Sequence, residues 1–140
     1  MSRWVAEAER WMADADEDLR VAEDLISSKH YAASCFHSQQ AAEKAVKACL
    51  YALSVEARGH SITGLLRVLR EVSDRDFEEL VEDAKLLDKH YSPPRYPNLH
   101  PGVESPAYEL YTRRDAESCL TSARKILNCM RELLELLSAT

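Results

Sequence analysis

The sequence has few residues that interrupt helices. Only three of its 140 residues are glycine, and all five prolines lie between Pro93 and Pro106. Proline removes a backbone donor and clashes with the preceding turn, and glycine weakens the interior of a helix. We therefore expect long helices on both sides of residues 91–106 and an irregular loop within that range. Loops longer than about 12–15 residues are usually functional or disordered.

Long hydrophobic runs are also absent. A membrane-spanning helix needs about 20 predominantly apolar residues, and no stretch of this chain approaches that pattern. The first residues lead directly into charged sequence and lack the apolar core of a signal peptide. We therefore expect a cytoplasmic protein that makes no contact with a membrane.

The cysteines show no spacing typical of a metal site. None of the four belongs to a C-x-x-C pair, and neither His30 nor His37 has a partner at zinc-finger spacing. The simplest interpretation is that the cysteines are small buried hydrophobic residues, although a disulfide between helices stays open. The spacing therefore predicts no metal ion and no cofactor. These cysteines are Cys35, Cys49, Cys119 and Cys129.

The formal net charge is −6, which argues against general binding to nucleic acid. Acidic residues concentrate in residues 1–28 and 74–90. An anionic substrate would therefore need a local basic pocket away from the first helix.

Apolar residues recur every three or four positions through most of the chain, as they do in helices that bury one face. No strand pattern or internal repeat competes with this signal. We predict a single all-α domain over residues 1–140, a bundle of four or five helices. The expected helices cover about residues 3–27, 31–54, 62–72 and 74–90, and the residues after Thr112.

Several polar residues indicate where these helices begin. Ser61 is a plausible N-cap, and the segments Ser73–Asp76 and Thr112–Asp115 both resemble capping boxes. His60 and His90 are interpreted as residues at helix ends. Within residues 31–54, the otherwise apolar stripe contains Gln39 and Glu43, which would need hydrogen-bond partners inside a bundle.

The expected loop contains an arginine and a histidine that together could cleave RNA without a metal. His100 could move a proton at the 2′-hydroxyl or at the leaving oxygen, and Arg95 could hold the phosphate. Asn98 could position a 2′-hydroxyl, and Tyr96 could stack on a base. The spacing also fits a structural role, in which Arg95 pairs with a carboxylate and His100 is an ordinary surface residue.

The tetrapeptide Arg95-Tyr96-Pro97-Asn98 resembles the Arg-Tyr-Pro-Asp/Asn signature of prokaryotic HEPN domains. Further segments resemble the family in the same order along nearly the whole chain. They are Trp11 with residues 15–19 and Ala22, then Phe36 with residues 39–45, Lys47 and Ala48, then residues 59–61 with Leu65 and Leu66, and finally residues 108–109, 111–112 and 115–116.

This resemblance implies an antiparallel helical bundle that dimerises. Many members are ribonucleases with an Arg and a His separated by four to six residues, which implies catalytic roles for Arg95 and His100. Two features depart from the active members. Tyr96 stands where a polar residue often follows the Arg, and His100 lies in the loop before Pro101 rather than at the start of the last helix.

The resemblance also implies partners. Prokaryotic members are often encoded beside a small nucleotidyltransferase, with which they form a toxin–antitoxin pair. The family name implies nucleotide binding, for which His37, Lys44 and Lys47 are candidate phosphate contacts on one face of a helix. That face could equally be a solvated stripe or a dimer seam. Two other functions stay open: a non-catalytic module that binds a nucleotide or a partner protein, and a structural helical adaptor.

Overall fold

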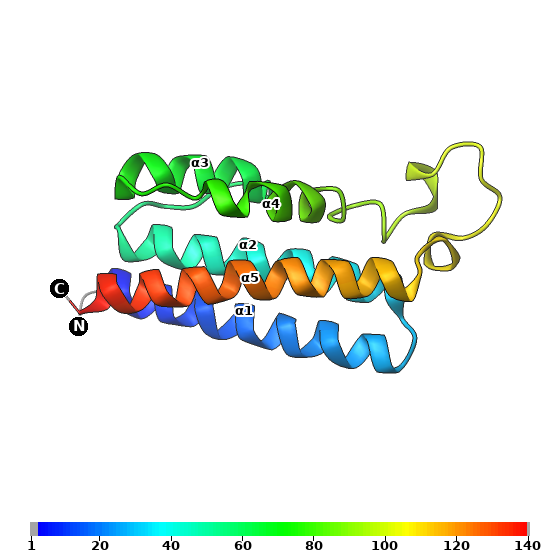
Figure 1. Cartoon of the computed structure of the whole chain (residues 1–140), viewed down its shortest axis with the longest axis horizontal. Helices are drawn as coiled ribbons and strands as arrows, with labels where there is room; N and C mark the ends of the chain where they lie inside the picture. The colour runs from blue at the N-terminus through cyan, green and yellow to red at the C-terminus, as the bar shows by residue number, and fades with distance from the viewer. Residues whose placement is uncertain (1–2, 140) are drawn as a thin grey trace.

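The central element of the fold is α2 (Tyr31–Ala52), which is buried along most of its length. In the computed structural model, which describes residues 3–139, α2 packs against α1 (Arg3–Ser27), α3 (Ile62–Ser73) and α5 (Arg113–Ser138). Figure 1 shows that α1 and α2 run in opposite directions and that α5 lies beside both. Alanines at four positions of α2 are fully buried, which lets neighbouring helices approach closely. They are Ala41, Ala42, Ala45 and Ala48.

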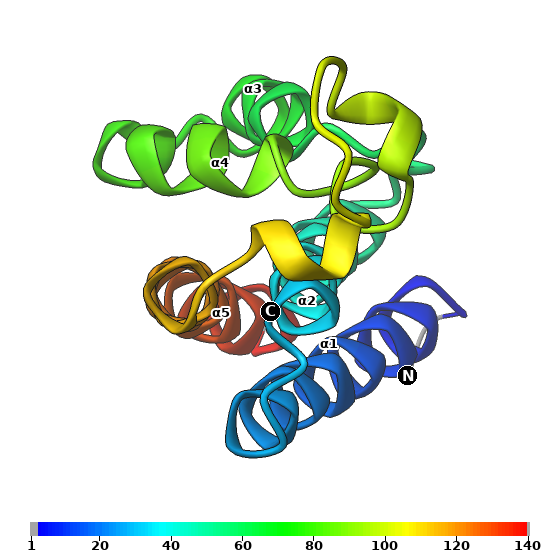
Figure 2. The ribbon, with the colours of Figure 1, turned by 90° about the vertical axis from the view of Figure 1, so that its right-hand side faces the viewer.

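A second layer consists of α3 and the short helix α4 (Val81–Asp88), which cover one side of the layer formed by α1, α2 and α5 (Figure 2). A 3-10 turn, η1 (Glu78–Leu80), leads into α4. The described residues form five α-helices and no strand, so the all-α antiparallel bundle predicted from the sequence is confirmed. None of the described helices is long and apolar enough to cross a membrane.

Two of the three predicted helix starts are confirmed. The side chain of Ser61 accepts a hydrogen bond from the Gly64 amide at the start of α3, and Thr112 and Asp115 form a complete capping box at the start of α5. Asp88, the last residue of α4, accepts hydrogen bonds from the amides of Ile62 and Thr63. The end of α4 is therefore tied to the beginning of α3.

The predicted capping box at Ser73–Asp76 is wrong. Ser73 belongs to the last turn of α3, where its hydroxyl donates to the carbonyl of Leu69. Asp74 then ends α3 in the left-handed conformation, with φ of 56°. Asp76 accepts a hydrogen bond from the Glu78 amide, so η1 and α4 begin later than expected. Aspartate tolerates the left-handed region better than most residues, so the same sequence can end one helix before it starts another.

Left-handed residues other than glycine follow three of the helices. Lys29 comes after α1 with φ of 66°, Ser54 comes after α2 with φ of 62°, and Asp74 follows α3. These positions are where a helix commonly ends on glycine. The chain, with three glycines in all, uses ordinary L-residues there instead.

The connection between α4 and α5 projects beyond one end of the bundle (Figure 1). We call residues 91–112 the proline loop, because they contain all five prolines. Two short 3-10 turns, η2 (Pro97–Leu99) and η3 (Ala107–Leu110), interrupt an otherwise irregular backbone. The irregular stretch predicted for residues 91–106 is therefore present, and it extends to the start of α5.

Candidate functional site

Arg95 lies on the surface of the proline loop, above a group of aromatic rings. Its guanidinium carbon lies 4.3 Å from the ring centroid of Phe36, 4.6 Å from that of Tyr91 and 5.2 Å from that of Tyr96. Its Nε donates a hydrogen bond of 2.8 Å to the carbonyl of Tyr91. In the described part of the chain, no carboxylate forms an ion pair with Arg95. The structural role considered from the sequence, in which a carboxylate holds Arg95, is therefore not observed. The guanidinium is therefore positioned without being neutralised.

His100 is half-buried and directly follows η2, the short 3-10 turn that separates it from Arg95. Its Nε2 lies 2.8 Å from the carbonyl oxygen of Pro93. A carbonyl can only accept, so Nε2 carries the proton and Nδ1 carries the lone pair. The ring meets Tyr111 edge to face, with 6.0 Å between centroids, and Tyr111 makes a similar contact with His90 at 5.8 Å. Burial raises the pKa of Tyr111 to about 12, so this phenol stays protonated beside His100.

The two candidate catalytic residues are anchored separately to the start of the proline loop. Arg95 is bonded to the backbone of Tyr91 and His100 to that of Pro93, and the two side chains make no direct contact. Tyr96 and Asn98 lie between them, and both are exposed. The loop thus presents four of the predicted site residues on one short turn that folds back on its own beginning.

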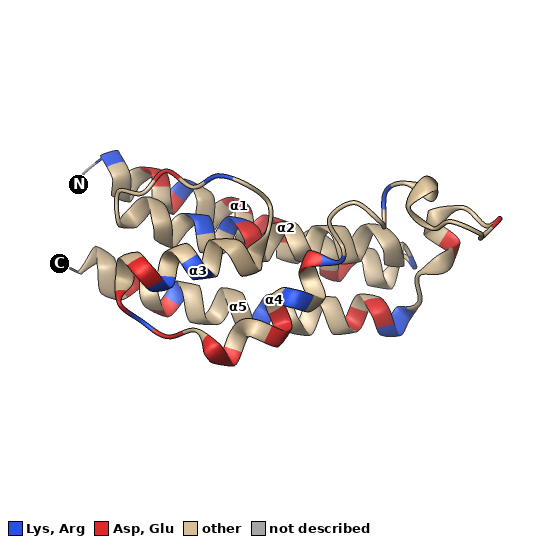
Figure 3. Ribbon diagram, turned by 90° about the horizontal axis from the view of Figure 1, so that it is seen from above, with Lys and Arg blue, Asp and Glu red and all other residues tan. Residues whose placement is uncertain are grey.

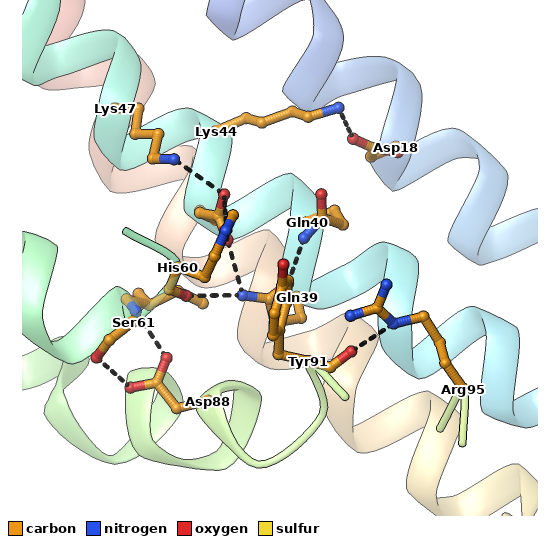
Figure 4. A network of polar contacts seen from close by, with 12 residues as sticks. Asp18, Gln39, Gln40, Lys44, Lys47, His60, Ser61, Asp88, Tyr91 and Arg95 are labelled. Atoms are coloured by element: carbon orange, nitrogen blue, oxygen red, sulfur yellow. Dashed lines mark hydrogen bonds and ion pairs between the residues drawn. The ribbon is translucent and has the colours of Figure 1, made fainter. Parts of the chain in front are cut away.

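A second polar group lies inside the bundle on α2. Gln39, Glu43 and Lys47 occupy successive turns of this helix and are all buried; we call them the polar row. Lys47 Nζ lies 3.1 Å from Glu43 Oε2, and Gln39 Nε2 donates to Glu43 Oε1 at 3.2 Å and to the carbonyl of His60 at 3.1 Å. The need for buried hydrogen-bond partners, inferred from the sequence for Gln39 and Glu43, is met in this way (Figure 4).

His60 and Tyr91 link the polar row to Arg95. The Nδ1 atom of His60 lies 3.3 Å from both carboxylate oxygens of Glu43, and its ring stacks on Tyr91 with 4.5 Å between centroids. Successive contacts thus lead from Lys47 through Glu43 and His60 to Tyr91 and Arg95. Figure 4 shows Lys47, His60, Tyr91 and Arg95 along this path. Interpreting His60 only as a helix-end residue missed this role. The available signal was Glu43, a carboxylate on an apolar stripe that needed a partner from elsewhere in the chain.

The predicted phosphate-binding stripe of α2 faces carboxylates instead of open solvent. Lys44 Nζ lies 2.7 Å from Asp18 Oδ2 on α1, and His37 Nδ1 lies 3.0 Å from Asp18 Oδ1. Burial alone would raise the pKa of Asp18, but its hydrogen bonds to His37 and Lys44 outweigh that effect and lower the pKa. Lys47 is buried against Glu43. Of the predicted basic residues, Arg95 is therefore the one whose charge has no acidic partner.

The distribution of charged residues also sets Arg95 apart from the basic residues of α2, which contact carboxylates. Acidic residues gather around η1 and α4, whereas the proline loop has Arg95 as its one basic residue and Glu104 and Glu109 as its acidic ones (Figure 3). An anionic ligand that approaches the loop would therefore meet its one unpaired cation at Arg95.

Comparisons with known proteins agree with the fold. The sequence model of the HEPN domain family matches residues 8–133. A protein of Methanocaldococcus jannaschii named "Putative toxin MJ1304" is 36% identical over 134 residues, which cover 91% of this chain and 88% of that protein.

Two solved structures are similar over almost their whole length. TT1696 from Thermus thermophilus superposes with a TM-score of 0.85 at 44% identity, covering 91% of this chain and 98% of that one. ST0689, described as an archaeal HEPN homologue, gives a TM-score of 0.76 at 39% identity, covering 96% of this chain and 99% of that one.

Proposed function

This chain belongs to the HEPN domain family, and on that premise we propose that it is a ribonuclease that cleaves RNA without a metal ion. The observation that supports this most directly is the environment of Arg95. Its guanidinium is exposed, is held in place by Tyr91 and by aromatic rings, and has no acidic partner. Such a group can bind a phosphate through two parallel hydrogen bonds, and its fixed position lowers the entropy lost on binding.

His100 supplies the proton transfer in this proposal. Its Nδ1 lone pair accepts the proton of the 2′-hydroxyl, while the 2′-oxygen attacks the phosphorus. The bond between phosphorus and the 5′-oxygen breaks, and that oxygen takes a proton from water. The products are a 2′,3′-cyclic phosphate and a 5′-hydroxyl end. Arg95 offsets the negative charge that develops on the phosphate oxygens, while Tyr96 stacks on a base and Asn98 holds the 2′-hydroxyl.

The other predicted binding residues contribute less to RNA binding in this proposal. His37, Lys44 and Lys47 already contact carboxylates, so each would have to leave Asp18 or Glu43 before it could contact a phosphate. We expect His37 and Lys44 to support RNA binding indirectly, by joining α2 to Asp18 of α1, and Lys47 to do so by stabilising the polar row.

A second copy of the chain completes the proposed site. Among the residues that the structure describes, four of the seven exposed large hydrophobic residues lie in the proline loop, and exposed apolar surface of this kind is typical of protein interfaces. A homodimer formed through the loop would bring two Arg95 and His100 pairs to one cleft. Light scattering of the purified chain should give the mass of two protomers, and the mass of one would contradict this. The four residues are Tyr96, Leu99, Val103 and Tyr108.

We further propose that the protein acts in the cytoplasm as a toxin and that a nucleotidyltransferase holds it in check. The toxin role is supported by the name of the relative that is 36% identical. The nucleotidyltransferase is the partner that family resemblance implies. Co-expression of this chain with such a protein encoded beside it should relieve growth arrest, and unchanged arrest would contradict the pairing.

RNA cleavage in EDTA tests the catalytic proposal. Replacing His100 with Ala should lower the cleavage rate by roughly 10²–10⁴-fold, the contribution typical of a general base. His30→Ala is the matched control, since His30 is exposed and its side chain forms no capping hydrogen bond. The products of the wild type should carry 2′,3′-cyclic phosphates. Equal cleavage by the wild type and by His100→Ala would remove the catalytic role.

The alternative is a module that binds a nucleotide or a partner through the same loop without cleaving RNA. It is favoured by the hydrogen bond that ties His100 to Pro93 and by Tyr96, which follows Arg95 where active members often have a polar residue. Calorimetry that detects nucleotide binding dependent on Arg95, together with no RNA turnover, would select this function.

A further inference from the structure

Two cysteines and a histidine from distant parts of the chain meet beneath the proline loop. Cys35 comes from α2, Cys119 from α5, and His90 follows the end of α4. One ligand atom from each residue lies within 4.8 Å of the other two. Both cysteines are fully buried and His90 is half-buried. The cluster escaped the sequence analysis because its members are far apart in the chain, where spacing gives no signal.

The histidine is oriented as a metal ligand would be. Nδ1 of His90 lies 2.8 Å from the carbonyl oxygen of Leu86, so it carries the proton and leaves the lone pair on Nε2. Ligating histidines usually donate their second ring nitrogen to a carbonyl or carboxylate in this way, which fixes the tautomer and the ring. Tyr111 packs edge to face against the same ring and further restricts it.

We propose that Cys35, His90 and Cys119 bind one zinc ion. Two thiolates and one imidazole are a ligand set that suits zinc. Zinc–sulfur and zinc–nitrogen bonds of about 2.3 and 2.0 Å place tetrahedral ligand atoms about 3.5–3.8 Å apart. The observed limit of 4.8 Å is therefore about 1 Å wider than required, a difference that small side-chain rotations can close.

The charges also balance inside the bundle. Each thiol gives up its proton to solvent as the ion binds, so two thiolates and a divalent cation form a neutral group with neutral His90. A neutral complex can stay in a low-dielectric interior at much smaller cost than an isolated ion. In the cleavage step proposed above, the ion would not contact the reacting atoms, since that step uses Arg95 and His100.

The other two cysteines have different surroundings. The Cys49 thiol donates to the carbonyl of Met130, an ordinary arrangement for a buried cysteine. Cys129 is half-buried and is not part of the cluster. Simple burial of a small residue thus accounts for Cys49, and Cys129 lies apart from the cluster, whereas Cys119 is within hydrogen-bond contact of both Cys35 and His90.

The position of the site gives it a structural role. The ion would join α2, α5 and the end of α4 at one point. His90 directly precedes Tyr91, whose carbonyl and ring hold Arg95. Zinc at this point would therefore fix the beginning of the proline loop and, through Tyr91, the position of the guanidinium.

Titration of the full chain with Co²⁺ tests the proposal, because cobalt replaces zinc and reports thiolate ligands by its absorption. The protein would first be stripped with a chelator and kept in a non-thiol reductant. We expect one Co²⁺ per chain with sulfur-to-cobalt charge-transfer bands. Cys119→Ala and His90→Asn should each weaken binding at least about tenfold. Cys129→Ala, the matched control, should bind as the wild type does.

Measuring the Tm of each variant with and without Zn²⁺ provides a second test, which still applies if a variant is less stable than the wild type. Zn²⁺ binds the folded state, so it should raise the Tm of the wild type and of Cys129→Ala by mass action but leave that of Cys119→Ala unchanged. Circular dichroism would confirm that each variant is helical. The proposal is overturned if the reduced wild type shows no charge-transfer bands, or if Cys119→Ala binds Co²⁺ equally well. Formation of a Cys35–Cys119 disulfide with no metal uptake after reduction would also overturn it.

Discussion

The polar row of α2 and the proline loop meet at Tyr91, yet their polar side chains are in opposite environments. Glu43 and Lys47 are buried and bonded to each other, to Gln39 or to His60. Arg95 on the loop is exposed and has a single hydrogen bond, to backbone. Polar groups satisfied within the chain mainly specify structure, whereas groups held in place but left unsatisfied are available to a ligand. The contrast therefore separates residues that build the bundle from residues that could act on a substrate.

The largest effect on stability is expected in the polar row. Glu43→Ala should lower the free energy of unfolding by about 3–5 kcal/mol, because it leaves Lys47 buried without a partner. Urea denaturation would measure this, with Glu17→Ala as the control, since the Glu17 pair with Arg20 is exposed. Replacing both buried partners, as Glu43→Leu with Lys47→Met, should restore most of the loss. A loss below about 1 kcal/mol in Glu43→Ala would mean that the row is not structural.

The loop should show the reverse pattern. Arg95→Ala should reduce RNA cleavage by roughly 10²–10³-fold, as loss of a charge-stabilising donor typically does. Its free energy of unfolding should change by about 1 kcal/mol or less, the value of an exposed cation–π contact. Arg95→Lys should retain part of the activity, since an ammonium keeps the charge but loses the planar fork. Arg58→Ala, at a highly exposed pair with Glu56, is the control.

A large loss of stability in Arg95→Ala would break the comparison, because it would place Arg95 with the structural residues. Cleavage and urea denaturation must therefore be measured on the same preparation. The two readouts then separate a catalytic loss from a partly unfolded sample.

A smaller effect is expected where α1 meets α2. Asp18→Asn should lower the free energy of unfolding by about 1 kcal/mol near neutral pH, a value reduced by the partial exposure of His37 and Lys44. The folded-state pKa of Asp18 lies below its ordinary value of 3.8. Its carboxylate therefore stabilises the fold above that pH, and the contribution is lost as the pH falls through the folded pKa.

Denaturation of the wild type and Asp18→Asn across acidic pH would measure this dependence. The difference in unfolding free energy should persist above pH 3.8 and shrink below it. A difference that grows as the pH falls would contradict the sign of the shift.

Local signals in the sequence predicted local structure well. Both the apolar periodicity of α5 and its Thr112–Asp115 capping box arise from residues that are close together in the sequence. The start of this helix could therefore be placed without knowledge of tertiary contacts. The prolines marked the loop for the same reason. Ser73–Asp76 failed because the signal for starting a helix also fits a helix that ends on a left-handed aspartate.

Contacts between distant segments could not be obtained in this way. The sequence indicated that Glu43 needs a partner, but only the packing of α2, α3 and the loop shows that His60 provides it and that Tyr91 stacks on His60. The meeting of Cys35, His90 and Cys119 depends on the same packing. The catalytic pair Arg95 and His100 lies within one loop, which is why sequence reasoning could propose it at all.

The left-handed residues at the helix ends offer a practical route to sturdier protein. Ser54 and Asp74 adopt a conformation that glycine accepts at about 1 kcal/mol lower cost than most L-residues. The ends of α2 and α3 that they follow lie at the end of the bundle away from the proline loop (Figure 1). Glycine at these two positions should therefore raise the free energy of unfolding. Destabilising variants of the polar row could then be assayed in this more stable protein.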